Sequence, residues 1–428
     1  MSDDRKPAIT YVDITDVGMR RANNQDSYLS VPAENRERFN SRGHLFVVAD
    51  GMGAHAAGEL ASKMATEAIS LNYFRDTNPD AVAALRDAVV QANKEIYTRG
   101  QQNPEFHNMG TTASTLAILP QGAVIAHVGD SRVYRLRRGV FEQLTFDHSL
   151  VWEMEASGQV SPDSALGQAI PKNVITRSLG PNGEVVVDIE GPIKVEKGDQ
   201  FLLCSDGLSG LVDDTEIGTL LDCLPEDLAA KVLVDLTNLR GGPDNTTVII
   251  VTVQEGADAS VEAARPKAKA QSMMPAVLGG LTILALVLAA GLAYMSNWGL
   301  AIVLAVSGVI SAVFFGSEVS KQQKEESAKP LPKVSGGKGP YRRFAAKADQ
   351  SLFNKLGETV QALRDAASNH NWLMEWTKID ALQKKGVAAL RESDPKQAIR
   401  LQAEAIIQTM QQLREQHNRA ADETAIDY

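Results

Sequence analysis

The sequence predicts an α+β protein in which antiparallel or mixed sheets are covered by helices, followed by a transmembrane hairpin and a small all-α C-terminal region. Three observations predict this order. Short apolar runs typical of strands alternate with amphipathic patterns typical of helices between residues 8 and 255. Two uncharged runs follow between residues 273 and 316. From residue 341 onward the apolar residues recur at helical spacing.

Composition limits the possible functions before any motif is considered. The chain has 428 residues, of which 44% are hydrophobic and 22% are charged, so it is long enough for several domains with a sizeable core. Its formal net charge of −10 disfavours non-specific binding to nucleic acid, which requires a basic surface. The only cysteines are Cys204 and Cys223, and Cys204 lies in an apolar strand pattern. We therefore expect no disulfide framework and a reducing compartment.

Residues 8–255 contain most of the predicted sheet structure. Apolar positions at helical spacing predict helices over residues 57–72 and 80–99. Apolar runs predict strands over residues 45–49, 112–119, 123–128, 133–136, 201–205 and 247–253. Because neighbouring strands are separated by gaps of turn length, we expect antiparallel or mixed sheets with the helices packed outside them.

Aspartates stand at the ends of several of these strands. Asp50 and Asp206 end apolar runs, Asp130 closely follows a third run, and Asp244 closely precedes a fourth. A single Asp-Gly pair usually marks a turn, but four carboxylates at strand ends are hard to explain as four unrelated turns. Carboxylate clusters without neighbouring Cys or His suit hard cations such as Mg²⁺ or Mn²⁺. The seven histidines show no spacing typical of zinc ligands.

Such a cluster favours phosphoryl chemistry. Two divalent cations can share a bridging water, lower its pKa and hold a phosphoryl group for in-line attack. A positive group is then needed for the phosphate oxygens. Arg20 and Arg21 lie shortly before another acidic residue, Asp26, and an arginine can bind phosphate through paired N–H donors.

A series of short motifs covers residues 8–253. In chain order they are RANNQD (21–26), VADGMG (48–53), GTT (110–112), GDSR (129–132), LTFDHS (144–149), ITRSLG (175–180), SDGL (205–208) and DNTT (244–247). In this order the motifs resemble those of the metal-dependent serine/threonine protein phosphatases of type 2C, the PPM family, in their bacterial form. Each motif alone is common, whereas the combination is specific.

The resemblance implies a four-layer α-β-β-α sandwich. It also implies hydrolysis of phosphoserine and phosphothreonine by a metal-activated water at a binuclear Mg²⁺ or Mn²⁺ site. The two ions would be held by Asp50, which bridges them, by the Gly51 carbonyl, and by Asp206 and Asp244. Phosphorylated proteins would be the substrates, and a serine/threonine kinase with its own substrates would be the opposing partner.

The resemblance implies further roles around the two ions. Asp26 would support the site through water, and Arg21 would bind the substrate phosphate and act with Asp50 in catalysis. Asp130, with Asp206, would contribute to a third and weaker metal ion that bacterial members hold. Residues 147–173 would correspond to a flap beside the site, where protein substrates are discriminated.

Two departures from the family pattern bear on the chemistry. Many members have Glu immediately before the aspartate matched by Asp26, and this chain has Gln25. Because an amide can still hydrogen-bond a metal-bound water, we expect an altered site that remains active. Animal members have a histidine shortly after Asp-Gly as a proposed general acid, and here Met52 and Gly53 follow. The acid would then be either His55 or a metal-bound water.

Residues 273–316 are predicted to form a transmembrane helical hairpin. Residues 275–295 contain no charge over 21 positions, a length of roughly 30 Å at about 1.5 Å per residue, which matches the hydrocarbon core of a bilayer. Residues 300–315 are also uncharged, and only residues 296–299 separate the two runs. The alternative is a buried hairpin in a soluble domain, but soluble helices rarely lack a polar face over such a length.

Flanking charges predict how the hairpin is oriented. Arg265, Lys267 and Lys269 precede it, Lys321 and Lys324 follow it, and the connecting loop has no charge. By the positive-inside rule both outer ends face the cytoplasm. We therefore expect a multi-pass protein of the cytoplasmic membrane whose catalytic and C-terminal regions are both cytoplasmic.

The remaining segments connect these parts. Residues 256–272 are expected to be a linker, and residues 317–340, which are rich in Pro, Gly, Ser and Lys, are expected to be a flexible linker. Residues 341–428 are predicted to form a helical interaction domain for an unknown protein partner.

Three functions fit these observations. The first is an active membrane-tethered phosphatase, the second is an inactive phosphatase that serves as a scaffold, and the third is a sheet protein that binds metal for stability alone. The set Arg21, Asp50, Asp206 and Asp244 favours the first. A scaffold does not need all four residues, and an arginine has no role in a purely structural metal site.

Overall fold

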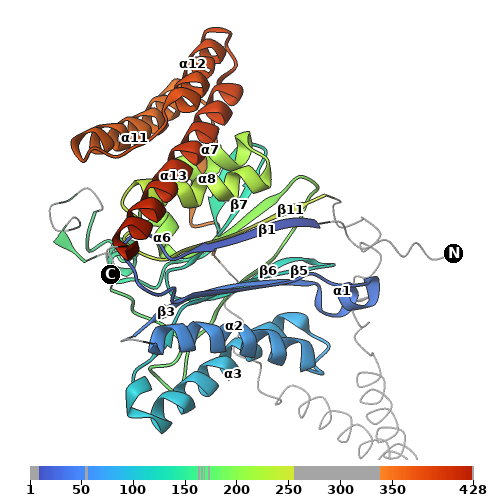
Figure 1. Cartoon of the computed structure of the whole chain (residues 1–428). Coiled ribbons are helices and arrows are strands. Elements are labelled where there is room, and N and C mark those ends of the chain that lie inside the picture. The colour runs from blue at the N-terminus through green and yellow to red at the C-terminus, as the bar shows by residue number, and fades with distance from the viewer. Residues whose placement is uncertain are drawn as a thin grey trace, which may run out of the picture. The chain divides into compact units, whose positions relative to one another are not determined.

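Two antiparallel β-sheets lie face to face at the centre of the described structure, and helices cover their outer faces (Figure 1). The computed structural model describes residues 9–254 and 338–426, apart from residues 54, 55, 162, 163, 165, 166, 168, 172 and 173. Within residues 9–254 the layers run helix, sheet, sheet, helix, which is the order that the resemblance implied.

The first sheet has six strands in the order β1-β11-β10-β7-β8-β12. In chain order they are β1 (Ile9–Asp16), β7 (Arg132–Arg137), β8 (Val140–Gln143), β10 (Gln200–Cys204), β11 (Thr246–Val253) and β12 (Arg342–Ala345). All neighbouring strands are antiparallel. Because β1 pairs with β11, the first and last strands of residues 9–254 lie side by side.

The second sheet follows the order β2-β3-β5-β6-β9, and β4 pairs with β3 outside this path. Its strands are β2 (Asp26–Val31), β3 (His44–Met52), β4 (Gly110–Thr111), β5 (Ala113–Leu119), β6 (Gly122–Val128) and β9 (Asp188–Ile193). The second sheet is also antiparallel throughout.

Each sheet has its own covering helices. The outer face of the second sheet carries α2 (Ala57–Arg75) and α3 (Ala81–Gln102), and that of the first carries α7 (Asp214–Cys223) and α8 (Glu226–Leu239). The short helices are α1 (Arg36–Arg42), the 3₁₀ helix η1 (Pro104–Phe106), α4 (Leu150–Ala156) and α6 (Asp206–Ser209). The C-terminal helices are α11 (Gln350–Asn369), α12 (Thr377–Arg391) and α13 (Pro395–Ile426).

Strand β3 explains why a continuous apolar run lies at the centre of this sandwich. Successive side chains of a strand point to opposite faces. Leu45 and Val47 pack in the cluster that includes α2 and α3, whereas Phe46 and Val48 pack in the cluster between the two sheets. Because both faces are buried, every position over residues 45–49 is apolar, and the strand predicted there is confirmed.

The predicted helices over residues 57–72 and 80–99 are confirmed as α2 and α3. Asp80 lies at the N-cap of α3, where its Oδ1 accepts hydrogen bonds from the backbone N–H groups of Val82 at 2.9 Å and Ala83 at 3.3 Å. These bonds satisfy donors that have no partner within the first turn of a helix.

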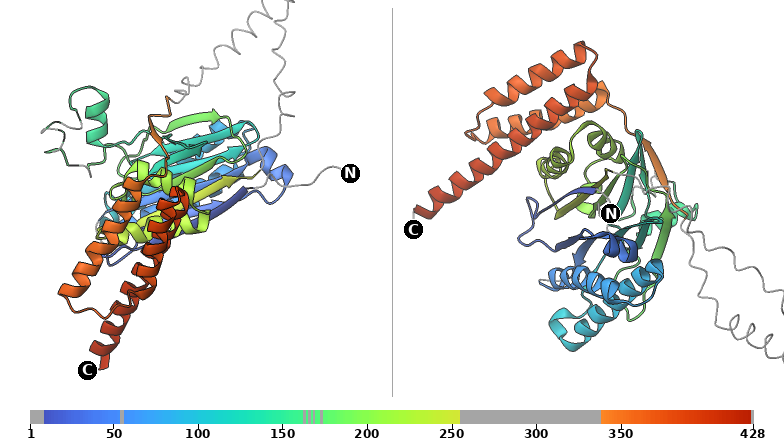
Figure 2. Two further views of the ribbon diagram at one scale, coloured as in Figure 1. Left: turned by 90° about the horizontal axis from the view of Figure 1, so that it is seen from above. Right: turned by 90° about the vertical axis from the view of Figure 1, so that its right-hand side faces the viewer.

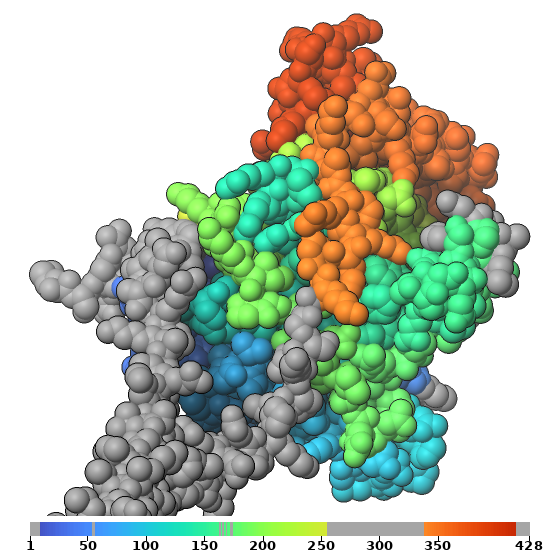
Figure 3. Space-filling view, turned by 180° about the vertical axis from the view of Figure 1, so that it is seen from behind, coloured from blue at the N-terminus to red at the C-terminus, as the bar shows by residue number. Residues whose placement is uncertain are grey.

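The C-terminal region differs from the separate helical domain that its sequence suggests. Residues 342–345 form strand β12, which extends the first sheet by pairing with β8, so that Arg343 lies opposite Glu142 and Phe344 lies opposite Phe141. Figure 3 shows this segment, in orange, lying on the surface of the sandwich. A four-residue strand has too short a pattern to be recognised when its partner lies about two hundred positions earlier in the chain.

The C-terminal helices also pack directly on the sandwich. Leu356 of α11 and Ile406 of α13 belong to the same buried apolar cluster as Leu220 of α7 and Leu233 of α8. The two further views in Figure 2 agree that α13 crosses the helices that cover the first sheet. Residues 9–254 and 338–426 therefore belong to one compact unit.

Several predicted segments lie outside the described residues. They are the linker at 256–272, the hairpin at 273–316 and the linker at 317–340 except for its last three residues. Within the ranges that are described, no helix combines the length and the apolar character needed to cross a bilayer.

Candidate active site

The sheets bring the predicted aspartates together from distant parts of the sequence. Asp26 begins β2 and lies directly opposite Asp50 of β3 in the antiparallel register. Asp206 is the first residue of α6, two residues after the end of β10. Asp130 lies two residues after β6, and Asp244 lies two residues before β11. The carboxylates thus lie where strands end, as the sequence predicts.

Asp26 is partly buried, and among the described residues only one of its two carboxylate oxygens has protein partners. Oδ2 accepts hydrogen bonds from Ser205 Oγ and Thr247 Oγ1, each at 2.7 Å. Oδ1 is buried and has no partner in the part of the chain that the structure describes. Burial raises the pKa of Asp26 to about 7, against the lowering effect of the two hydroxyl hydrogen bonds, and the charges of Asp206 and Asp244 raise it further.

Asp50 is surrounded by other carboxylates. Burial raises its pKa well above the ordinary value, and the charges of Asp26, Asp206 and Asp130 raise it further. A hydrogen bond joins the side chains of Asp50 and Asp206, and the pKa of Asp206 is also raised, by burial and by Asp244. Like-charged groups in one low-dielectric site cannot all ionise without a compensating cation.

Asp130 completes a set of carboxylates, here called the acidic group, that consists of Asp26, Asp50, Asp130, Asp206 and Asp244. Burial raises its pKa to about 8, and the charges of Asp206 and Asp147 contribute to this rise. Its Oδ1 atom, like Oδ1 of Asp26, is buried and has no partner among the residues described.

Arg21 lies at the rim of the acidic group. Its Nη2 is 2.7 Å from Oδ2 of Asp244, and its Nε donates to the Pro243 carbonyl at 3.2 Å. Arg21 is about half exposed, since 47% of its side chain is accessible. The structure therefore brings together the predicted phosphate-binding arginine and one of the predicted metal ligands.

Asn245 is a site residue that the sequence reasoning did not single out. Its Nδ2 donates to the carbonyls of Val17 at 2.9 Å and Asn23 at 3.0 Å, and its Oδ1 accepts from the Gln25 N–H at 2.8 Å. One side chain thus holds both ends of the loop that carries Arg21. The available signal was its place in the DNTT motif, next to Asp244.

Gly51 is required by close packing. A Cβ atom at this position would lie 2.1 Å from the Gly58 carbonyl oxygen and 2.6 Å from that of Gln25, so no side chain fits. The Gly51 N–H donates to the Gln25 carbonyl at 3.1 Å. The backbone beside Asp50 can therefore approach both the start of α2 and the residue before Asp26.

The remaining predicted residues are described only in part. His55, the alternative general acid, lies outside the described residues, as do several positions of the flap at 147–173. At the start of the flap, Oδ2 of the buried Asp147 lies 2.7 Å from Arg132 Nη2. Helix α4 belongs to the described part of the flap, and Arg342 of β12 lies over the ring of its Trp152, 3.9 Å from the centroid.

The donor atoms of the site fit hard divalent cations. They are carboxylate oxygens, and two of them, Oδ1 of Asp26 and Oδ1 of Asp130, are buried without partners in the described ranges. Among the described side chains, no three His, Cys, Asp or Glu residues already stand in a metal-binding arrangement. Instead, Asp244 pairs with Arg21, and Asp50 is hydrogen-bonded to Asp206.

Comparison with known proteins decides the family. The family model for protein phosphatase 2C matches residues 20–235, which is half of the chain. The chain belongs to the protein phosphatase 2C family. Members of this family are metal-dependent protein phosphatases that use Mn²⁺ or Mg²⁺, so the predicted enzyme class and cofactors are confirmed.

Curated relatives and solved structures agree with this assignment. The protein phosphatase PhpP of Streptococcus pneumoniae is 38% identical over 248 residues, which cover 56% of this chain and 96% of PhpP. The serine/threonine phosphatase stp of Listeria monocytogenes is 38% identical over 227 residues, which cover 50% of this chain and 88% of stp. Both alignments leave a large part of this chain without a counterpart in the relative.

Solved structures show the same fold. The serine/threonine phosphatase of S. agalactiae is 34% identical, with a TM-score of 0.51 over 57% of this chain and 100% of that chain. The phosphatase PstP/Ppp of Mycobacterium tuberculosis is 33% identical, with a TM-score of 0.50 over 58% of this chain and 99% of that chain. The predicted phosphatase fold is confirmed, while the hairpin and the partner of the C-terminal helices stay predictions.

Proposed function

We propose that this 2C-type phosphatase is tethered to a membrane and hydrolyses phosphoserine and phosphothreonine in proteins that a serine/threonine kinase has modified. The observation that supports the catalytic part is the group of buried and partly buried aspartates with raised pKa values beside an arginine. Two ions would be held by Asp50, the Gly51 carbonyl, Asp206 and Asp244, with Asp26 acting through water and Asp130 contributing to a third ion.

Arg21 is the residue that we expect to bind the substrate phosphate. A guanidinium group has five N–H donors. Arg21 uses Nε for the Pro243 carbonyl and Nη2 for Asp244, and its other donors have no protein partner among the described residues. Because the side chain is about half exposed, these donors can reach a phosphate that approaches from solvent.

The aspartates would prepare the site for water. When bound, two divalent cations lower the pKa of a shared water and offset the charge of the phosphate. Ser205 and Thr247 hold one oxygen of Asp26, which leaves Oδ1 as an oriented acceptor for a hydrogen bond from water. Asp50 lies opposite Asp26 in the register, and the charges of Asp206 and Asp130 act on its carboxylate. This central position among the carboxylates suits a bridging role.

The variant Asp50→Asn tests this proposal with two measurements. Phosphate release from a phosphothreonine peptide at saturating Mn²⁺ should fall by orders of magnitude. In the absence of metal the variant should be at least as stable as the wild type, because the substitution removes one of the mutually repelling charges. Mn²⁺ should then raise the melting temperature of the wild type and have little effect on the variant.

The exposed Asp87 of α3 provides the matched control, since Asp87→Asn changes the same atoms outside the acidic group. Its activity and its response to Mn²⁺ should equal those of the wild type. Near-normal turnover of Asp50→Asn at saturating Mn²⁺ would show that the two-metal assignment is wrong.

We propose the membrane tether from the sequence alone. Residues 275–295 and 300–315 lack charge, and basic residues flank the pair on both outer sides. Tethering would raise the effective concentration of the phosphatase toward phosphoproteins at the membrane. A fluorescent reporter after Tyr428 that matures only in the cytoplasm should be bright, and Asn297→Cys should react with an impermeant thiol reagent from outside. A dark, expressed reporter together with a shielded thiol would contradict the model.

The C-terminal helices offer a surface for a protein partner. A groove of about 780 Å³ lies between α8, α12 and α13. Its lining includes the apolar Leu228, Leu382 and Ile407 and the basic Lys231, Lys378, Lys385 and Arg400. Asp227 and Glu404 also line it, and Glu404 pairs with Arg400 at 3.4 Å, so the lining keeps an excess of positive charge. We propose that an acidic partner segment with apolar side chains binds there.

This partner surface can be tested with a labelled amphipathic peptide that carries glutamates on one face and leucines on the other. Anisotropy should show binding to the wild type and loss of binding to the double variant Lys378→Glu/Lys385→Glu. A control pair on the same helix that does not line the groove, Lys384→Glu with Arg391→Glu, should bind normally. Equal binding by both double variants would contradict the proposed groove.

A further inference from the structure

The C-terminal half of α13 contacts the catalytic domain through Arg414. Its guanidinium Nη2 lies 3.1 Å from Oδ2 of Asp16, at the end of β1, and 3.2 Å from Oδ1 of Asp235, on α8. The carboxylate of Asp235 is 3% exposed. Neither aspartate has another ion pair within the described ranges, although Lys231 lies close enough to influence Asp235 electrostatically. Arg414 is therefore the cation that two neighbouring carboxylates share.

The carboxylate of Asp16 contacts α13, α8 and the loop that carries Arg21. While Oδ2 contacts Arg414, Oδ1 accepts hydrogen bonds from the Gly18 N–H at 2.8 Å and from Asn238 Nδ2 at 3.0 Å. The conformation of this carboxylate thus sets the first turn of the loop. Without Arg414, Asp16 and Asp235 would repel each other with no shared cation between them.

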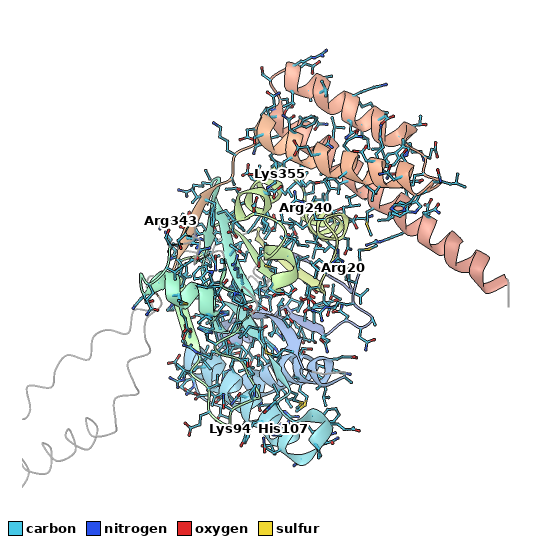
Figure 4. All side chains as sticks on the ribbon, turned by 90° about the vertical axis from the view of Figure 1, so that its left-hand side faces the viewer. Arg20, Lys94, His107, Arg240, Arg343 and Lys355 are labelled. Atoms are coloured by element: carbon cyan, nitrogen blue, oxygen red, sulfur yellow. The ribbon has the colours of Figure 1, made fainter. Side chains whose placement is uncertain are left out.

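The loop in turn lies directly against the segment that carries Asp244. The N–H groups of Met19 at 2.8 Å and Arg20 at 3.2 Å both donate to the Gly242 carbonyl. Gly18 has a φ of +81°, and a Cβ there would lie 2.4 Å from the Asp244 carbonyl oxygen. Figure 4 shows Arg20 of this loop and Arg240 at the end of α8 on the side of the domain that α13 covers. If the loop shifts, the backbone around Asp244 must therefore shift with it.

We propose that Arg414 is a positioning residue of the phosphatase: through Asp16 it holds the loop that presents Arg21 to the substrate phosphate. The docking of α13 then controls how well the catalytic site binds phosphate. This inference rests on the proposed role of Arg21. It assigns to the C-terminal helix an effect on catalysis that is separate from any partner that the helices bind.

The test measures steady-state kinetics of the full-length protein on a phosphothreonine peptide at saturating Mn²⁺. Arg414→Met keeps most of the side chain's length and removes its charge. We expect KM to rise about three- to tenfold with kcat within twofold of the wild type, and Arg414→Lys to recover part of the loss. Lys396→Met is the matched control, because Lys396 forms its ion pair from the same helix to Asp222 of α7, on a different element from the loop that carries Arg21. Its KM should not change.

The route through Arg21 is tested in the Arg21→Ala background. There Arg414→Met should raise KM no further, since the side chain that the contact positions is already gone. A merely structural role of Arg414 would lower the melting temperature and would act equally in both backgrounds. If Arg414→Met does not fold, Asp16→Asn weakens the same contact from the other side, keeps the acceptor for Gly18, and should show the same pattern.

The outcomes separate this inference from the proposed function. An Arg21→Ala variant with unchanged KM would overturn the role of Arg21 itself. A raised KM for Arg21→Ala together with an unchanged KM for Arg414→Met would overturn the inference and leave the proposed function intact. Equal effects of Arg414→Met in both backgrounds would also overturn it.

Discussion

The packing of the C-terminal helices on the sandwich predicts that one core substitution will destabilise the phosphatase as a whole. Leu356 of α11 is completely buried in the apolar cluster that also contains residues of α7, α8 and α13. Replacing a buried leucine by alanine costs about 2–5 kcal/mol of unfolding free energy, because apolar contacts are lost and a cavity remains. At about 2–4 °C per kcal/mol for a domain of this order of size, Leu356→Ala should lower the melting temperature by roughly 4–20 °C.

The assay follows thermal unfolding and phosphatase activity in parallel. If residues 9–254 and 338–426 unfold together, a single transition should shift, and activity after heating should be lost at the same lower temperature. Leu373→Ala is the matched control, because Leu373 lies in the same region and is 76% exposed. Its melting temperature should stay within about 2 °C of the wild type, as expected for a surface substitution.

A different result would refute this reasoning. If Leu356→Ala produced a second, earlier transition while the activity loss stayed at the wild-type temperature, the helices would unfold independently of the catalytic domain. The contacts between α11, α13 and the sandwich would then contribute little to its stability.

Three further predictions concern the flap, the site backbone and pH. Arg342→Ala removes a cation from the ring of Trp152 on α4; it should raise KM for a phosphoprotein a few-fold and leave hydrolysis of p-nitrophenyl phosphate unchanged. Gly51→Ala places a Cβ 2.1 Å from a backbone oxygen of α2, so a Mn²⁺ titration should show weaker activation. Burial opposes ionisation of Asp188, but its partners, chiefly His148, lower its pKa from 3.8 to about 2. Its stabilising contribution is therefore present above pH 4 and lost as pH falls toward 2, so urea midpoints of Asp188→Asn should fall less steeply over that range.

The sequence predicted the central strands and helices more completely than it predicted the pairing of the C-terminal segment. The sequence predicted the strand that leads into Asp50, the helices α2 and α3, and the aspartates at strand ends. These elements could be predicted because burial on both faces of a strand gives a continuous apolar run, and a helix gives a 3.6-residue period. The family motifs added roles that periodicity alone does not contain. Asn245 was overlooked because its contacts with Val17, Asn23 and Gln25 span more than two hundred positions.

What the sequence by itself determined is local: the alternation of strands and helices, the residue types of the acidic group, and the family. What only the tertiary structure decided is non-local. The pairing of β12 with β8 and the contact of Arg414 with Asp16 join positions about two hundred and about four hundred residues apart, and no local pattern records such pairs. The raised pKa values arise in the same way, because burial and mutual repulsion exist only once the chain has brought Asp26, Asp50 and Asp206 into one low-dielectric site.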